Sequence, residues 1–180
     1  MFKKHFNIIL VGLIIFVSTG TLIWQRFNIE PQAAAFVGDT EFYRGEVVHA
    51  DDITLLTYNG AQIWMDQNTD VKLIDGTAGS TIINVLQGRV VILDSSATIE
   101  TRDLKIVVNG TTSFVNYSWE NRVEIASITG STRLERNGDI VDLTNQALST
   151  TTFPPYEDEY KTFDPENSSA AEFYKTALTK

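Results

Sequence analysis

The sequence predicts an all-β domain, either an antiparallel β-sandwich or a short β-solenoid, preceded by one transmembrane helix and followed by a short C-terminal helix. Three observations predict this. A long uncharged run lies near the N-terminus, short β-branched runs separated by Gly, Asn and Asp fill the middle, and an acidic, aromatic segment follows. At 180 residues the chain has room for one domain of ordinary size with short appendages.

The strongest signal is the apolar segment FNIILVGLIIFVSTGTLIW, residues 6–24, which carries no charged side chain. At about 1.5 Å per residue, a helix of this length crosses a hydrocarbon core of about 30 Å. Lys3 and Lys4 precede the segment and only Arg26 closely follows it, so the positive-inside rule places the N-terminus in the cytoplasm. We therefore expect a cytoplasmic stub at 1–5, a transmembrane helix at 6–24, and the later residues in the periplasm or at the cell surface.

A cleaved signal peptide is the alternative interpretation, with Ala33, Ala34 and Ala35 as a small-residue cleavage site. The apolar run is longer than the hydrophobic region of an ordinary signal peptide, and the alanines lie well beyond its end. These two facts favour a retained anchor. In both interpretations the rest of the chain is exported.

Residues 25–45 contain Pro31 and show no clear period, which predicts a linker, with a first edge strand over 33–37 as the alternative. The β domain is expected over 46–149, where β-branched and alternating runs end at Gly, Asn or Asp. The predicted strands are 46–49, 53–58, 61–65, 70–74, 81–86, 89–93, 97–101, 105–108, 112–119, 122–129, 131–136 and 140–144.

Six dipeptides between these runs predict chain reversals, because Gly and Asn tolerate the positive φ of tight hairpins. They are Asn59-Gly60, Asp75-Gly76, Gln87-Gly88, Asn109-Gly110, Thr129-Gly130 and Asn137-Gly138.

Trp64 lies between Ile63 and Met65 in the predicted strand 61–65. Successive side chains of a strand point to opposite faces, so inward Ile63 and Met65 leave Trp64 facing outward. Its place directly after the Asn59-Gly60 turn predicts Trp64 in the core, whereas alternation with inward Ile63 and Met65 leaves it against a neighbouring turn or the aromatic C-terminal segment.

Residues 150–180 are expected to form an acidic, aromatic tail, because three prolines interrupt any strand ladder there. Ser168 or Ser169 is a suitable N-cap for a short helix that runs to Leu178. Two interpretations of the aromatic side chains stay open: they pack back on the domain, or they dock a partner. These side chains are Phe153, Tyr156, Tyr160, Phe163, Phe173 and Tyr174.

Composition excludes several functions. The chain has no cysteine, which excludes disulfides, thiolate metal sites, a cysteine nucleophile and a lipid-modified N-terminal cysteine. The net charge is −9, and every Asp and Glu follows the apolar segment, so the domain offers no basic surface for nucleic acid. The expected contacts are with the membrane, through the N-terminal helix, and with another envelope protein.

We expect no enzymatic activity, no cofactor and no metal. His5 and His49 are far apart and show no metal-ligand spacing. Asp51 and Asp52 are typical of a turn, and the acidic run 157–159 is typical of a solvated segment, with a weak divalent-cation site as the lesser alternative. Glycosylation sequons begin at Asn109, Asn116 and Asn167, although Asn-Gly-Thr is also ordinary turn chemistry.

The run NGAQIWMDQNTDVKL, from Asn59 to Leu73, resembles the opening strand pair of the FecR-like domain family, which is named after the iron-dicitrate transport regulator. LQGRVVI at 86–92 resembles the family's Gly-centred hairpin, and Gly110-Thr111 followed by Phe114 resembles its Gly-Thr-x-Phe strand. One extra residue separates Thr111 from Phe114, which predicts a bulge or a shifted register there. Residues 128–134 and 139–148 resemble the next hairpin and the closing strand.

The family resembled here includes regulators whose extracytoplasmic domain passes a signal from an outer-membrane receptor to a cytoplasmic sigma factor. The resemblance therefore implies a signalling role of this kind. The five residues 1–5 are too few to hold a sigma factor, so we expect no direct sigma control. The expected role is a membrane-anchored binding, sensing or scaffold module that contacts another envelope protein through its β domain or its C-terminal tail. An anchored β jelly roll with a structural or lipid-conduit role is the alternative.

Overall fold

The computed structural model describes residues 35–77, 80–102, 104–117, 121–144, 146–162, 164 and 169–179. The predicted cytoplasmic stub 1–5, the transmembrane helix 6–24 and the first part of the linker lie outside these ranges. Within the ranges, no helix is both long and apolar enough to cross a membrane. The membrane anchor therefore stays a prediction from the sequence.

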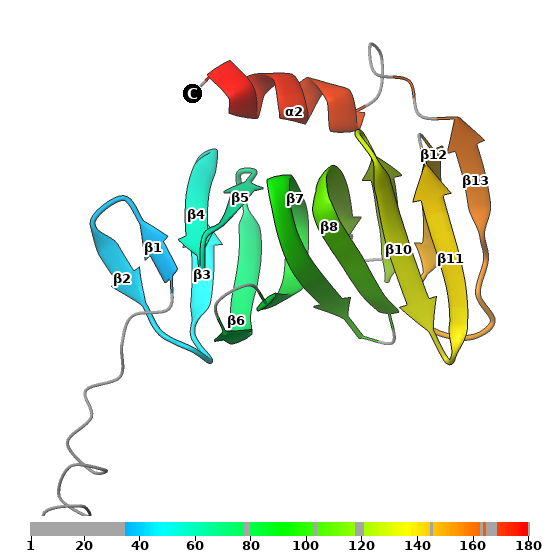
Figure 1. Cartoon of the computed structure of the whole chain (residues 1–180), viewed down its shortest axis with the longest axis horizontal. Coiled ribbons are helices and arrows are strands. Elements are labelled where there is room, and N and C mark those ends of the chain that lie inside the picture. Colours follow the sequence, from blue (N-terminus) through cyan, green and yellow to red (C-terminus); the bar gives the residue numbers. More distant parts are fainter. Residues whose placement is uncertain are drawn as a thin grey trace, which may run out of the picture. The chain divides into compact units, whose positions relative to one another are not determined.

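Strands dominate the described residues, and a short helix follows them (Figure 1). This confirms the predicted all-β class with its C-terminal helix. The elements are β1 (Ala35–Val37), β2 (Thr40–Phe42), β3 (Val47–Ala50), β4 (Thr54–Tyr58), β5 (Ala61–Met65), β6 (Thr69–Thr77), β7 (Ser80–Thr101), β8 (Leu104–Tyr117), β9 (Arg122–Ser127), β10 (Ser131–Arg136), β11 (Asp139–Thr144), β12 (Gln146–Thr151), β13 (Glu159–Thr162) and α2 (Ser169–Thr179).

All described strand pairs are antiparallel, and their main path runs β13, β12, β9, β8, β7, β5, β4, β1 and β2. β3 and β6 branch from this path at β7, and β10 and β11 branch from it at β8. The branches arise because β7 and β8 are long and change neighbours along their length. β7 pairs first with β6, then with β5 and the end of β8, and finally with the start of β8.

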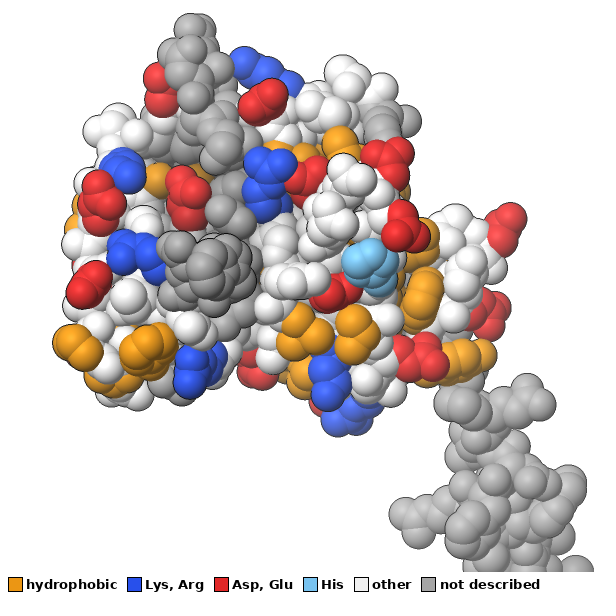
Figure 2. All heavy atoms as spheres, turned by 180° about the vertical axis from the view of Figure 1, so that it is seen from behind, with side chains coloured by type: hydrophobic (Ala, Val, Ile, Leu, Met, Phe, Trp, Pro, Cys, Tyr) orange, Lys and Arg blue, Asp and Glu red, His pale blue; other side chains and the backbone are white. Residues whose placement is uncertain are grey.

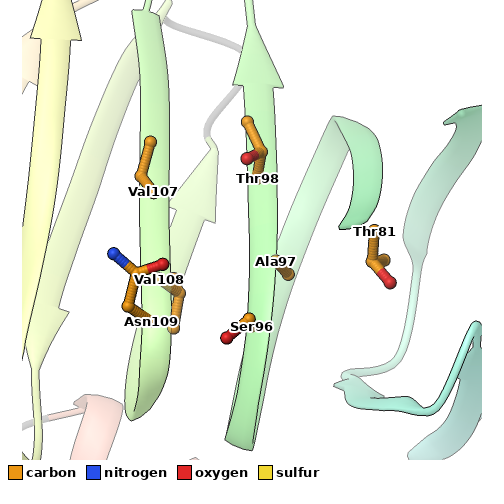
Figure 3. Close-up of a pocket in the computed structure, with 7 residues that line it drawn as sticks. All are labelled: Thr81, Ser96, Ala97, Thr98, Val107, Val108 and Asn109. Atoms are coloured by element: carbon orange, nitrogen blue, oxygen red, sulfur yellow. The ribbon is translucent and has the colours of Figure 1, made fainter. Parts of the chain in front are cut away.

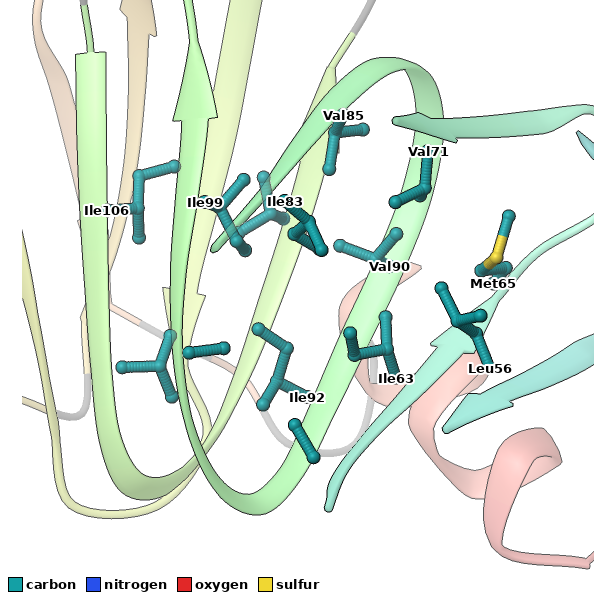
Figure 4. Packing of buried hydrophobic residues seen from close by; sticks show 14 of the residues in the cluster. Leu56, Ile63, Met65, Val71, Ile83, Val85, Val90, Ile92, Ile99 and Ile106 are labelled. Carbon is teal, nitrogen blue, oxygen red and sulfur yellow. The ribbon is translucent and has the colours of Figure 1, made fainter. Parts of the chain in front are cut away.

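The long strand β7 bends around the hydrophobic core. Ile83 from its first part, Ile92 from its middle and Ile99 from its last part are fully buried in one cluster (Figure 4). Leu56 of β4 and Ile63 of β5 belong to the same cluster. The pairing of β7 with β8 shifts register at two points between Ile92 and Ala97, which confirms the irregularity predicted near Gly110 and Phe114. One strand thus supplies side chains to the core from several directions.

The six predicted reversals fall into two groups. Asn59-Gly60 and Asn137-Gly138 each connect two paired strands, as expected. Thr129-Gly130 reverses the chain between β9 and β10, which pair with β8 and not with each other. The other three predictions are wrong as hairpins: Asp75-Gly76 lies within β6, Gln87-Gly88 within β7 and Asn109-Gly110 within β8. The physical reason is the length of these strands, since glycine also suits the bulges and bends by which one strand passes between neighbours. The predicted strands 81–86, 89–93 and 97–101 are therefore one continuous strand.

The described sheet is longer at both ends than the predicted β domain, 46–149. β1 confirms a strand within 33–37, but it pairs with both β2 and β4, so β2 and not β1 lies at the edge. β13, inside the predicted tail, pairs with β12 in the register Gln146 to Thr162. The prolines end the strand before β13 but do not prevent the chain from returning to the sheet.

Candidate protein-interaction surface

Helix α2 buries two apolar side chains, Phe173 and Ala177, on one side. Phe173 is 4 % exposed and Ala177 is 1 % exposed, and these residues are four positions apart, so they lie on the same helical face. Leu178, one position further on, is 58 % exposed. Glu172 stands in the first turn, where a negative charge interacts favourably with the helix dipole.

The buried face of α2 covers the outer side of the sheet. We call the covered surface the α2 seat: it consists of Trp64, Val91, Leu93, Ala126 and Ala147, which form one cluster with Phe173. Strand register places two pairs of these residues directly opposite each other: Trp64 pairs with Val91, and Ala126 pairs with Ala147. Ile53, Ile128 and Tyr174 pack at the edge of the same cluster. The sheet is therefore apolar on both sides at this point.

Trp64 lies outside the main core, so the core prediction is wrong and the position given by strand alternation is the one observed. Ile63 and Met65 are fully buried in the core, and Trp64, between them, faces outward and is partly buried in the cluster that contains Phe173. Trp64 thus rests against the aromatic C-terminal segment, which was one of the two expected supports. Alternation along a strand was sufficient to predict this orientation.

Arg89 connects the seat to the helix. Its guanidinium forms an ion pair with Asp66, whose side chain is only 12 % exposed, and its Cζ lies 5.7 Å from the centre of the Phe173 ring. The backbone adds a second link, because the Asp66 N–H donates to the Arg89 carbonyl at 3.0 Å. A cation over an aromatic ring is attracted to its π face. No sequence pattern indicated this role of Arg89.

The other tail aromatics have different environments. Arg136 lies over the Tyr156 ring at 4.5 Å, and the Tyr156 hydroxyl accepts a hydrogen bond from the Asn137 side chain at 2.8 Å. Arg102 lies over the Phe153 ring at 5.0 Å. Tyr160 is 53 % exposed, and Phe163 lies outside the described residues. Most of the described aromatics therefore pack on the domain, while Tyr160 faces solvent.

An ion pair holds the segment between β12 and β13. Arg136 donates to Asp158 through Nη1 at 2.6 Å and also through Nη2, and the Thr150 hydroxyl donates to the same carboxylate at 2.5 Å. The hydrogen bond from Arg136 is the main cause that lowers the pKa of Asp158. The acidic run 157–159 is exposed, as the sequence predicts, but the Asp158 side chain is only 21 % exposed because Arg136 and Thr150 bind its carboxylate. Glu157 and Glu159 keep exposed side chains and pair with Arg122 and Lys161.

His49 forms a second polar cluster on another part of the sheet. Its Nδ1 lies 2.6 Å from the Asp70 carboxylate on the paired strand β6, and its Nε2 lies 3.4 Å from Asp51. The Gln87 side chain donates to the other Asp70 oxygen at 2.7 Å. The hydrogen bond to Asp70 raises the pKa of His49 above its ordinary value of 6.5. His49, coloured pale blue in Figure 2, is the one histidine among the described residues.

Charged side chains largely pair with each other across the described surface, and Figure 2 shows both signs interspersed on one face. Each of the following cations contacts a carboxylate: Arg44, Arg89, Lys105, Arg122, Arg133, Arg136 and Lys161.

Across the residues that the structure describes, no group of three His, Asp or Glu side chains is placed to hold a metal ion. The sequon residue Asn109 is exposed, whereas Asn167 lies outside the described ranges.

A small cavity of about 160 Å³ opens beside the bend of β7 and β8 (Figure 3). Hydroxyl and amide side chains contribute to its lining, and they come from Thr81, Ser96, Thr98 and Asn109. The Thr81 hydroxyl already donates to the Tyr58 carbonyl at 3.0 Å. The cavity is polar and large enough for several water molecules, so it suits solvent.

Comparison with known proteins gives a likeness of fold. No protein-family model and no curated protein matches the sequence. Two crystal structures of a "putative anti-sigma factor" from Parabacteroides distasonis ATCC 8503 are similar, with TM-scores of 0.55 and 0.54 and identities of 15% and 16%. Each covers 66% of this chain, and this chain spans 60% and 59% of theirs, which is less than two thirds of their length. At this identity the likeness shows the fold alone, and the FecR-like family stays a prediction.

Proposed function

We propose that this chain is a membrane-anchored binding or sensing module of the cell envelope, whose β domain lies outside the cytoplasm and acts by contact with another protein. The observation that carries the proposal is the shared fold with the two structures described as an anti-sigma factor, which suggests a regulatory or sensing module. The FecR-like strand and turn pattern points to the same class from the sequence. The uncharged segment 6–24 supplies the anchor in this proposal.

A binding role also suits the surface. One apolar patch lies under α2, and many of the described cations pair with carboxylates. The chain is acidic overall, so its surface does not attract nucleic acid. We propose no catalytic role, because the Thr150 hydroxyl at the Asp158 cluster donates to a carboxylate that Arg136 already binds and so has no base to activate it. The cluster at Asp158 instead fixes a segment of backbone.

The lipid-conduit alternative needs a continuous apolar groove. The larger of the two described cavities, about 320 Å³, surrounds the β10–β11 turn and is lined by Lys105, Glu135, Arg136 and Asp139 among others. The apolar outer face of the sheet lies under α2. Acyl chains gain little from charged or hydroxyl-lined surfaces, so these features favour the protein-binding proposal.

Site-specific photo-crosslinking in the native membrane tests the proposal. A crosslinking amino acid is placed in the full-length chain at Val47, Tyr160 or Ile140, which are exposed, and at buried Ile92 as the control. We expect one distinct protein adduct from at least one exposed position and none from Ile92. Adducts with lipid alone, or no adduct from any exposed position, would contradict the proposal.

Orientation is tested on the same cells. Protease added outside intact spheroplasts should digest the β domain. In untreated cells, mass spectrometry of the mature chain should find the N-terminal segment still attached to the domain. A mature chain that begins near Phe36 would refute the anchor, and a β domain protected from protease would refute the orientation.

A further inference from the structure

We propose that β3 is a docking edge, to which an extended segment of the partner protein adds as a further strand, with a basic side chain beside Asp51. The inference rests on the proposed binding function and names its surface and the kind of segment that binds there. Four described strands lie at an edge of the sheet because each pairs with a single neighbour, and these are β2, β3, β11 and β13. The backbone N–H and C=O groups on the outer side of an edge strand can pair with another chain.

β3 differs from the other three edge strands in its side chains. Natural proteins protect an edge with charged side chains, which oppose pairing with another chain. β2 contains Glu41, β11 contains Asp139 and Asp142, and β13 contains Glu159 and Lys161. β3 has the sequence VVHA, with no Asp, Glu, Lys or Arg, and its Val47 is 46 % exposed. Among the described edges, β3 is therefore the one without this protection.

The backbone of β3 faces β6 and the open edge in turn. The carbonyls of Glu46 and Ala50 accept backbone hydrogen bonds at 3.0 and 2.7 Å from the chain in β6 and directly before it. Positions along an antiparallel strand alternate between those that hydrogen-bond to the neighbour and those that do not. The N–H and C=O groups of Val47 and His49 therefore point to the open edge. There the structure describes no further strand.

The side chains of Val47 and His49 lie on the outer face of the sheet, because Val48 and Ala50, which alternate with them, are each 1 % exposed. An added strand would hydrogen-bond to the backbone of Val47 and His49 and place two of its own side chains beside theirs. An apolar side chain suits the position beside Val47. The next position on the same face lies beside His49.

Charge selects a basic side chain beside His49. Its Nδ1 lies 2.6 Å from Asp70 and its Nε2 lies 3.4 Å from Asp51, whose side chain is 97 % exposed. Acidic side chains outnumber basic ones around β3 and β6, and Figure 2 shows carboxylates beside the pale blue histidine. On these strands and beside them lie Glu46, Asp51, Asp52, Asp66, Asp70 and Asp75, against Arg44, Lys72 and Arg89. Arg44 pairs with Asp75 and Arg89 pairs with Asp66, so a cation brought by the partner is attracted to Asp51.

The same charges disfavour a second copy of this chain as the occupant. Pairing of two β3 strands would bring two acidic clusters together, and each chain carries a net charge of −9. Like charges placed opposite each other across an interface oppose association. The occupant is therefore a segment of a different protein.

Photo-crosslinking with the full-length chain in its native membrane tests the geometry. A crosslinking amino acid is placed at Val47 or at His49, with Ile140 on β11 and Tyr160 on β13 as controls on other edges. We expect the strongest protein adducts from Val47 and His49, and mass spectrometry should map them to partner residues two positions apart. This spacing indicates a strand paired with β3, because alternate side chains of a strand share a face.

Val47→Pro, with the crosslinker at His49, tests the backbone hydrogen bond. Proline removes the N–H that points to the open edge, a change that edge strands tolerate. Val47→Ala is the matched control, because it shortens the side chain and keeps the N–H. We expect Val47→Pro to lower the adduct yield at least about tenfold, and Val47→Ala less than about threefold, because only proline removes the donor. Thermal unfolding checks that both variants fold.

Asp51→Lys, with the crosslinker at Val47, tests the charge and decides the question if Val47→Pro does not fold. Glu157→Lys is the matched control, because its side chain is 70 % exposed and lies in the segment before β13. We expect Asp51→Lys to lower the adduct yield about tenfold and Glu157→Lys to change it less than about twofold.

Several outcomes would overturn the inference while the proposed function stands. They are adducts from Ile140 or Tyr160 alone, adducts without the spacing of two residues, and equal yields for a variant and its matched control. An adduct that consists of a second copy of this chain would also overturn it. The absence of adducts from all four positions would overturn the proposed function as well.

Discussion

The side chain of Thr69 occupies the space beside Gly88 that any larger residue would need: a Cβ on Gly88 would lie 2.4 Å from the Thr69 hydroxyl oxygen and 2.6 Å from the Thr69 Cα. Gly88 also has a φ of 92°, in the region that favours glycine. The Thr69 hydroxyl accepts a hydrogen bond from the Arg89 N–H at 3.1 Å. This contact holds β6 against β7 at the point where β7 leaves β6 for β5.

Gly88→Ala should therefore destabilise the domain by about 3 kcal/mol, from the positive φ and from the clash with backbone. Gly138→Ala is the matched control, because Gly138 has a φ of 89° and nothing within 4 Å of the added carbon. We expect the control to cost only the backbone part, about 1 kcal/mol. Urea denaturation of both variants measures the difference in the free energy of unfolding. An equal decrease in both would show that Thr69 moves away from the new Cβ without loss of stability.

The two sides of strand β5 should respond differently to truncation. Ile63→Ala opens a cavity in a fully buried site and should cost about 3 to 4 kcal/mol. Trp64→Ala should cost less, because the side chain is only partly buried and α2 can settle toward the sheet. Thermal unfolding compares the two with Gln62→Ala, an exposed position on the same strand. A larger loss for Trp64→Ala than for Ile63→Ala would contradict the described burial.

The strands with clear alternation were predictable, and the long-range contacts were not. β5 and β10 begin and end where the sequence places them, because alternation and Asn-Gly turns are local signals. The continuity of β7 through Gly88 was missed, since a glycine at a bend and a glycine in a hairpin look alike in sequence. The Phe173 and Ala177 spacing predicts an apolar helical face, but nothing local shows that Trp64 and Val91 lie beneath it.

The long-range polar contacts were also not predictable from local sequence signals. Arg136 and Asp158 are separated by 22 positions, and Arg89 and Asp66 by 23, so their pairing depends on strand order. The acidic run 157–159 reads as solvated because all three residues are charged. Only the placement of the segment beside β10 shows that Asp158 is the residue bound by Arg136.

The Arg136–Asp158 pair should make stability depend on acid pH. The pKa of Asp158 is lower in the folded chain than its ordinary 3.8, so the pair contributes fully above that value and is lost as the pH falls through the folded pKa. Asp158→Asn should lower stability at pH 7 and flatten its decrease below about pH 4. Glu159→Gln is the control in the same segment. Denaturation at pH 7 and pH 3 measures both effects, and parallel curves for the wild type and Asp158→Asn would refute the coupling.

The His49 cluster should make stability depend on pH in the opposite direction, with stabilisation lost as the pH rises. Asp70, hydrogen-bonded to the imidazole, raises the pKa of His49 above 6.5 in the folded chain, so the stabilisation is present below pH 6.5 and is lost as the pH rises through the folded pKa. Asp70→Asn removes the largest cause and should bring the pKa of His49 back toward 6.5. Asp51→Asn should shift it less, because Asp51 lies 3.4 Å from the ring and its side chain is 97% exposed. NMR titration of the His49 ring protons gives the order of the two variants, and a larger shift from Asp51→Asn than from Asp70→Asn would show that the contact across β3 and β6 does not control this imidazole.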